Sequence, residues 1–361
     1  MIFARSPFII TIDETPQEST RLELFLWNGT GAAPAAPTYS LSKKVPSVNN
    51  NATYYNIAPF IREFFDFTQS SPIATGMTAN TNDYAYCNVI YKTYYTLDGT
   101  ETLLNTVTDV AFDGFGYFED DYNYQGQNVL LSQLRGFGGG NVYYYDCDNE
   151  SNAGIVTLYT QATVLNTWIA RYTNLSTGTV QNVTLTNNRV VDISRVYTGW
   201  NAVGNTLRII KTVGPVETIV VTFAFVPQCE CKYDVINVDF VNRWGAWQRE
   251  FFYKASTESV EMTNNQFKSN PVPFPNYNLT QPQYKTFNTN GKRTYKLNTG
   301  WVNENYKQVI EEMLLSEMIR VDGLPANLKT KSIEKFKSIN TKTINYTMEF
   351  EMAYDIINSI S

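Results

Sequence analysis

The chain has 361 residues and a formal net charge of −6, with 43% hydrophobic, 14% aromatic and 17% charged residues and no histidine. This composition is typical of a globular protein of two or three domains. The missing histidine excludes serine–histidine and cysteine–histidine catalysis and most zinc sites. The acidic balance gives the whole molecule no attraction for nucleic acid or an acidic membrane.

Residues 1–83 are predicted to form an amino-terminal β-rich segment with one short helix. Leu22, Leu24 and Leu26 alternate with polar residues, as in a half-buried strand, and a second strand is expected over 38–45. Apolar residues between 57 and 65 recur at helical spacing, with Asn56 as the expected cap and Pro59 in the first turn. The first residues lack the pattern of a signal peptide, and no run approaches ~18 apolar residues, so no membrane insertion is expected.

Residues 84–230 are predicted to be an antiparallel β domain, because short apolar runs alternate there with turn residues. The expected strands are 84–97, followed by an Asp98-Gly99 turn, and 141–145, 154–159, 179–186, 206–213 and 218–225. Strands of this length and spacing are typical of a sandwich or barrel. The fold class expected for the whole chain is therefore mainly β, with a smaller α+β unit at the carboxyl end.

Residues 231–361 are predicted to be that α+β unit. Residues 264–290 contain four prolines among aromatic side chains, which indicates a loop-like arm, extended rather than helical, that is either a linker or a contact for a neighbouring subunit. A helix is expected after a cap at Asn303 or Asn305, with Glu312 on its polar side. In the last strand, alternate residues are apolar and share one face: Ile344, Tyr346, Met348, Phe350 and Met352.

Carboxylates provide the strongest catalytic candidate in the chain. Glycosidases need two carboxylates that flank the scissile bond, and nearby aromatic side chains such as Phe118 and Tyr122 are suited to stack on sugar rings. The alternative is a solvated loop, which adjacent acidic residues in a Gly/Asn/Tyr-rich segment usually form. The acidic residues concerned are Asp113, Glu119, Asp120, Asp121, Asp146 and Asp148.

Three other features are weighed and set aside. The glycines from Gly136 to Gly140 lack the Lys-Ser/Thr pair of a phosphate loop, so a turn is expected there. The four cysteines are expected to be reduced, because so few in a long chain do not form a disulfide framework. The basic run is interpreted as a solvated face, or alternatively as a contact for acidic neighbours or passing DNA: Lys329, Lys331, Lys335, Lys337 and Lys342.

Three stretches of the carboxyl-terminal third resemble tail ring or hub structural proteins of crAss-like and related phages that infect Bacteroidetes. They are the series VINVDFVNRWGAW over 235–247, TGWV over 299–302 leading into 309–316, and 346–353. The resemblance covers roughly residues 230–361. It implies a virion subunit of the tail or baseplate, made in the host cytoplasm, that contacts itself and adjacent tail or portal-proximal proteins. Transient passage of phage DNA past the subunit is left open. The resemblance carries no catalytic residues.

The sequence thus predicts a non-enzymatic homo-oligomer that assembles through aromatic and neutral polar surfaces. The expected interface residues are Phe137, Phe274, Tyr277 and Tyr284. No catalytic residue, cofactor or metal is expected. Two alternatives remain open, because exposed Tyr and Trp with Asn and Asp also suit sugar recognition. One is a receptor- or glycan-binding tail module, and the other is the carboxylate glycosidase.

Overall fold

The computed structural model is built mainly from antiparallel β-sheets, so the predicted fold class is confirmed. It divides into two compact units. The first comprises Met1–Cys229, Asp239–Glu250 and Asn305–Glu317, and the second Glu230–Val238, Phe251–Glu304 and Met318–Ser361. The three-part division made from the sequence stays a prediction. The structure describes residues 1–45, 51–67, 79–81, 83–124, 131, 136–137, 140–146, 155–160, 166–185, 190–194, 204–230, 232–269, 280, 282–303, 306–332 and 343–358.

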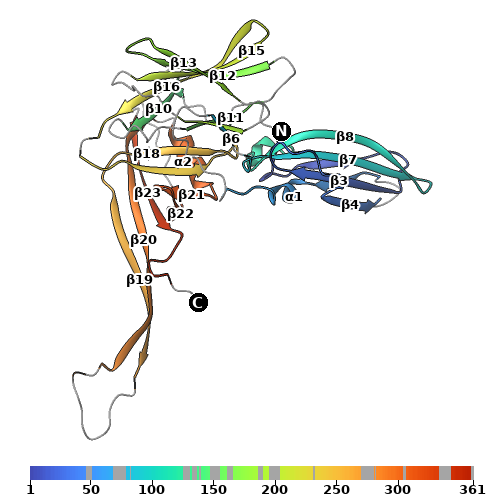
Figure 1. Ribbon diagram of the computed structural model, residues 1–361. Helices are drawn as coiled ribbons and strands as arrows, with labels where there is room; N and C mark the ends of the chain where they lie inside the picture. Colours follow the sequence, from blue (N-terminus) through green and yellow to red (C-terminus); the bar gives the residue numbers. More distant parts are fainter. Residues whose placement is uncertain are drawn as a thin grey trace. The chain divides into compact units, whose positions relative to one another are not determined.

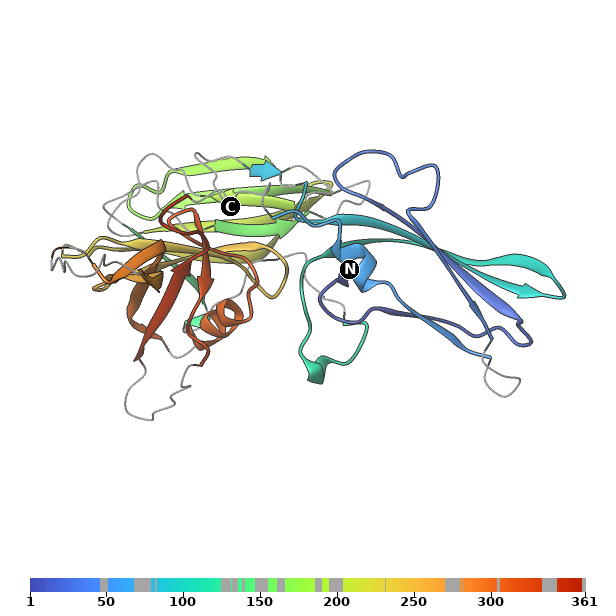
Figure 2. The ribbon, with the colours of Figure 1, turned by 90° about the horizontal axis from the view of Figure 1, so that it is seen from below.

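A five-stranded sheet with the order β1-β8-β7-β3-β4 begins the first unit. β1 runs parallel to β8 and the other neighbours are antiparallel, and the cyan β7–β8 hairpin lies beside blue β3 in Figures 1 and 2. The predicted turn is present, since Asp98 and Gly99 both have positive φ angles of 49° and 70°, as a tight hairpin requires. The strands are β1 (Ile2–Phe3), β3 (Ser19–Trp27), β4 (Tyr39–Lys44), β7 (Cys87–Leu97) and β8 (Thr100–Phe112).

The two-stranded sheet of β2 (Ile9–Ile12) and β5 (Thr53–Asn56) shares a core with the five-stranded sheet, as does α1 (Ala58–Arg62). The predicted inward face of β3 is confirmed, because Leu22, Leu24 and Leu26 are buried in this core. The helix is shorter than predicted and its N-cap is Ile57, without a side-chain cap. Asn56 instead shares its side-chain oxygen between the N–H groups of Phe8 and Ala58.

A six-stranded sheet, β13-β12-β15-β16-β10-β9, and a three-stranded sheet, β11-β14-β6, follow in the first unit. Apolar residues of β11 pack against β12, β15 and β16 in one core, an arrangement that falls within the predicted class of a sandwich or barrel. The strands are β6 (Ala79–Thr81), β9 (Gly136–Phe137), β10 (Gly140–Asp146), β11 (Ile155–Tyr159), β12 (Asn166–Asn174), β13 (Val180–Leu185), β14 (Val190–Ser194), β15 (Asn205–Val213) and β16 (Val216–Gln228).

Cys87 is free, but Cys229 is disulfide-bonded, so the expectation of reduced cysteines is wrong there.

The last sheet has the strand order β18-β17-β21-β22-β23-β20-β19, and the chain passes between the two units within β17 and within β18. Its strands are β17 (Ile236–Val241), β18 (Trp247–Phe252), β19 (Thr257–Lys268), β20 (Tyr284–Asn303), β21 (Ile319–Val321), β22 (Leu324–Leu328) and β23 (Thr343–Met352). In β23 the predicted inward face is confirmed, because Tyr346, Met348, Phe350 and Met352 are buried.

Two expectations near the carboxyl end are wrong. The arm predicted over 264–290 is extended as expected but not loop-like at its ends, because 264–268 lie in β19 and 284–290 lie in β20. Asn303 does not cap the helix, because it is the last residue of β20, and Asn305 lies outside the described residues. The helix itself, α2 (Lys307–Leu314), has Tyr306 as N-cap and buries Glu312 together with its apolar stripe.

Candidate functional site

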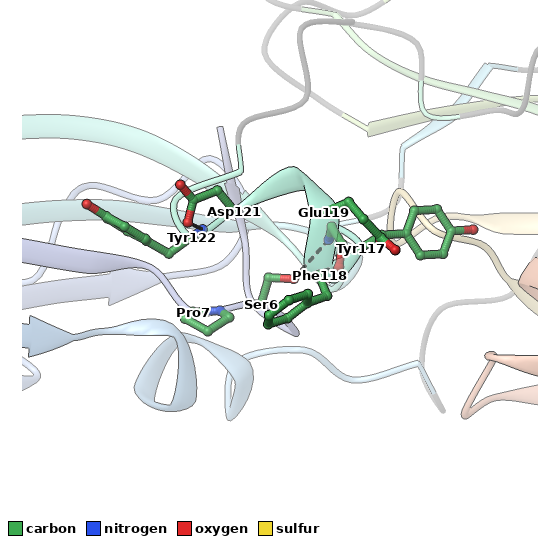
Figure 3. Close-up of a pocket in the computed structure, with 8 residues that line it drawn as sticks. Ser6, Pro7, Tyr117, Phe118, Glu119, Asp121 and Tyr122 are labelled. Carbon is green, nitrogen blue, oxygen red and sulfur yellow. Dashed lines mark hydrogen bonds between the residues drawn. The ribbon is translucent and has the colours of Figure 1, made fainter.

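An exposed turn between β8 and the six-stranded sheet carries the acidic and aromatic residues that the sequence singles out. Its centre is the 3-10 turn η1 (Phe118–Asp120), which Figure 3 shows in close-up. The Asp120 carboxylate accepts a hydrogen bond of 2.8 Å from the Tyr117 N–H, and the Asp120 N–H donates to the Tyr117 carbonyl at 2.9 Å. We call residues 116–122 the acidic turn. Both hydrogen bonds lie within the acidic turn and stabilise its backbone.

The amino-terminal segment holds the acidic turn on both sides. At the start, the Gly116 N–H donates to the Ser6 hydroxyl at 2.8 Å, drawn as a dashed line in Figure 3. Just past the end, the side-chain amide of Asn123 bonds to both the N–H and the carbonyl of Ile9, and the Asn123 N–H donates to the Pro7 carbonyl at 3.0 Å. An amide that replaces a backbone partner in this way fixes the direction in which the chain leaves the turn.

Arg243 is the main support beneath the acidic turn. Its guanidinium forms an ion pair with Asp120 and donates a 3.2 Å hydrogen bond to the Phe115 carbonyl. The same group lies over three aromatic rings, at 4.3 Å from the ring centroid of Tyr117 and 5.0 Å from those of Tyr124 and Trp244. A planar, permanently charged fork can make these contacts at once, whereas a lysine ammonium cannot.

The loop that carries Arg243 is itself fixed by buried polar groups. The Arg243 backbone N–H donates to the Glu312 carboxylate at 3.2 Å. Glu312 itself is fully buried in α2. The prediction that Glu312 lies on the polar side of the helix, away from the apolar stripe, is therefore wrong, because Glu312 is buried with a distant backbone N–H as its partner. Gly245 has a φ angle of +76°, and a Cβ there would lie 2.7 Å from the Asp113 nitrogen, so this position requires glycine.

The surface of the acidic turn is aromatic and acidic. A pocket of about 510 Å³ is lined by Ser6, Pro7 and residues of the turn. The Phe118 side chain is 99% exposed and that of Tyr122 is 58% exposed. Figure 3 shows Asp121 and Tyr122 on one side of the turn, and Tyr117 and Glu119 on the other. Exposed rings on a well-anchored backbone bind partners at little entropic cost.

The structure separates the candidate catalytic carboxylates by environment. Glu119 and Asp121 line the pocket, whereas Asp120 is held by Arg243 and serves the turn itself. Asp113 is buried, and its ion pair with Arg62 spans 3.4 Å. The side chain of Asp146 and the whole of Asp148 lie outside what the structure describes. Asp120 is thus a structural carboxylate, and the pocket offers Glu119 and Asp121 beside aromatic rings.

Asp113 gives the first unit a testable dependence on pH. Burial raises the pKa of its carboxyl to about 6, against the opposing effect of Arg62 and Arg5. Since this pKa lies above the ordinary value, the folded state binds the proton more tightly than the unfolded state. The stabilising effect is present below about pH 4 and is lost as pH rises through 6, by up to about 3 kcal/mol.

We therefore expect Asp113→Asn to flatten the fall in the free energy of unfolding between pH 4 and 6.5, as measured by urea unfolding. The exposed Asp13→Asn serves as the matched control and should keep the wild-type profile. Equal slopes in wild type and Asp113→Asn would show that Asp113 titrates normally.

A second exposed surface lies in the second unit. β19 is an edge strand of its sheet and pairs in antiparallel fashion with the first part of β20. Every residue of β19 is exposed, and so are residues 284–289 of β20. Figure 1 shows β19 and β20 continuing as a pair beyond the other described strands of their sheet. We call this part, residues 264–268 and 284–289, the far half. We call residues 257–268 and 284–296 the ribbon.

Large apolar side chains project from the ribbon into solvent. Val260, Met262, Phe267, Tyr284 and Phe287 are all exposed, with Met262 65% exposed. The Phe267 and Phe287 rings pack edge to face with centroids 5.7 Å apart. The far half of the ribbon, where residues 265–268 pair with 284–287, is exposed on both faces and therefore has no core of its own. A two-stranded hairpin of this kind is marginal in isolation. Such a surface is typical of one that a partner covers.

The predicted interface residues fall partly on this ribbon. Tyr284 is the first residue of β20 and is 58% exposed. Phe137 lies in β9, which pairs with β10, so its backbone is in a sheet rather than in a turn. Phe274 and Tyr277 lie outside the described residues. These four assignments stay predictions.

Other sequence features take ordinary structural roles where they are described. Lys329 of the basic run forms an ion pair with Glu261 of the ribbon, and Lys331 is exposed. Lys335, Lys337 and Lys342 lie outside the described residues. Among the residues that the structure describes, no group of three or more metal-ligating side chains is placed to hold a metal ion. Neither of the described helices has the length and apolar character needed to cross a bilayer.

Comparisons with known proteins add little to this description. No protein-family model matches the chain, and no curated protein matches it. Among solved structures, the chain is similar to the crystal structure of the FN1–FN3 domains of chicken CNTN1. The identity is 7%, the match covers 81% of this chain and 92% of that one, and the TM-score is 0.20. A likeness at this level carries no argument about function.

Proposed function

We propose that this protein is a non-enzymatic structural subunit that assembles with copies of itself into a ring or hub of a phage tail. The observation that carries the proposal is the ribbon, whose exposed apolar side chains have no core to enter within their own sheet. Burying a side chain such as Phe or Met against a partner contributes about 1.5–3 kcal/mol. Five of them supply enough free energy to offset much of the cost of association.

The placement in a phage tail rests on the resemblance of residues 230–361 to tail ring and hub proteins of crAss-like phages. The segments that carry this resemblance form β17, the end of β20, α2 and β23. The acidic turn supports assembly independently, because it presents Phe118 and Tyr122 on a backbone fixed by Arg243. The subunit would reside in the virion and contact adjacent tail proteins as well as its own copies.

Electron microscopy of the purified protein tests this proposal. We expect closed rings or hubs of many subunits, because burial of the ribbon stabilises assembled copies. A variant with Val260, Met262, Phe267 and Phe287 all replaced by serine should be dispersed and still folded, since these side chains are exposed in the single chain. Dispersed single particles of the wild-type protein across micromolar concentrations would contradict the proposal.

One observation favours a second candidate, a receptor- or glycan-binding module. The pocket beside the acidic turn combines exposed rings with the carboxylates of Glu119 and Asp121, and such a combination suits sugar recognition. A glycan-array screen separates the two. Binding that is lost in Tyr122→Ser would favour the module, whereas no binding together with ring formation would favour the structural subunit. Turnover of a bound glycan that is lost in Glu119→Gln would favour the glycosidase.

A further inference from the structure

The far half of the ribbon is aromatic and basic. Residues 264–268 and 284–289 contain two lysines and no acidic residue. Lys285 lies directly opposite Phe267 in the strand pairing, and Lys268 lies opposite Tyr284. Opposed residues of an antiparallel pair point to the same face, so each face of the ribbon carries a lysine beside an aromatic ring. Neither lysine forms an ion pair within the described part of the chain.

The acidic turn has the complementary character. It presents Phe118 and Tyr122 with Glu119 and Asp121, while the third carboxylate, Asp120, is already matched by Arg243. Its pocket of about 510 Å³ falls within the range of about 300–1,000 Å³ that accommodates small ligands, which leaves room for an aromatic side chain. Each face of the far half thus combines a lysine with aromatic side chains, Lys285 with Phe267 and Phe287 on one face and Lys268 with Tyr284 on the other. This combination complements the two carboxylates, two rings and pocket of the acidic turn.

We propose that the far half of the ribbon of one copy docks on the acidic turn of the next copy. This proposal rests on the proposed function and adds the two contact surfaces to it. Because the two surfaces are different, the contact is heterologous, and repetition of a heterologous contact produces a ring when the rotation closes. The aromatic side chains supply the buried apolar area of this contact. The lysine–carboxylate pairs fix its orientation and exclude wrong partners.

Paired charge reversals test this docking directly. A ribbon variant carries Lys268→Glu and Lys285→Glu, and a turn variant carries Glu119→Lys and Asp121→Asn, in which asparagine tolerates the positive φ of 66° at this position. We expect each variant alone to assemble about 100-fold more weakly than wild type, because like charges then face each other. Mass photometry of the intact chains over a dilution series measures this change.

A mixture of the two variants should assemble again. The unchanged ribbon of the turn variant meets the unchanged turn of the ribbon variant, and the two altered surfaces also carry opposite charge. A contact between two identical surfaces, ribbon with ribbon or turn with turn, would leave one of the two variants able to assemble alone. Restored assembly in the mixture, with neither variant assembling alone, is therefore the result that the proposal predicts.

Matched controls keep the test specific to these surfaces. Lys44→Glu with Lys331→Glu makes the same change in net charge as the ribbon variant at other exposed lysines, and Glu14→Lys with Asp13→Asn matches the turn variant. Both controls should assemble as wild type does. Wild-type assembly that persists in both charge-reversed variants overturns the docking proposal and leaves the proposed function standing. A wild-type chain that never assembles overturns both.

Discussion

Replacing Arg243 with alanine is expected to lower the free energy of unfolding by about 3 kcal/mol. The substitution removes the ion pair to Asp120, the hydrogen bond to the Phe115 carbonyl and the contacts with the rings of Tyr117, Tyr124 and Trp244. Asp120 is part-exposed, so water can rehydrate its charge, and the expected loss lies at the lower end of the range for broken buried pairs. Urea unfolding followed by tryptophan fluorescence measures it.

Two further variants show whether the geometry or the charge of Arg243 matters. Arg243→Lys keeps the charge but loses the planar fork, so we expect an intermediate loss of stability. Arg293→Ala removes an arginine from an exposed ion pair with Glu258, in which both side chains are about half exposed, and should cost less than about 1 kcal/mol. An Arg243→Ala protein as stable as Arg293→Ala would mean that the acidic turn does not depend on this support.

Tyr346→Asp is expected to destabilise the second unit by about 4 kcal/mol or more, because it removes a buried ring and places a carboxylate in its site. Tyr346 is buried in β23, on the same face as the fully buried Met348 and Phe350. Thermal unfolding and the soluble fraction after expression both report the effect.

The neighbouring residue provides the matched control for this strand. Thr347→Asp places the same charge on the opposite, exposed face of β23, where Asn298 donates a 3.2 Å hydrogen bond to the Thr347 hydroxyl. A carboxylate can accept that bond, so the expected loss is less than about 1 kcal/mol. Similar losses for the two variants would mean that the faces of β23 are assigned wrongly.

Local sequence patterns predicted the elements whose structure is determined by residues close together in the sequence. The period of two in β23 places Met348 and Phe350 in the core, and Asp98-Gly99 predicts the turn between β7 and β8. The strand β8 itself has most of its residues exposed over 100–109, so it offers no apolar alternation from which to predict it.

Partners that are distant in the sequence could not be predicted in this way. Glu312 lies at a position that helical spacing assigns to the polar side, yet it is buried because the Arg243 backbone N–H needs an acceptor there. The prolines between β19 and β20 indicated a loop-like arm from residue 264, whereas 264–268 continue β19 and 284–290 begin β20. The aromatic and acidic residues of the turn were singled out, but their support by Arg243 needed the fold.

Sedimentation velocity of the wild-type chain over a wide concentration range tests most directly whether the exposed surfaces join copies of this protein. We expect a discrete species whose mass is a fixed multiple of the 41.1 kDa chain and which dissociates when the ribbon side chains are replaced by serine. A single 41.1 kDa species at every concentration would contradict this expectation.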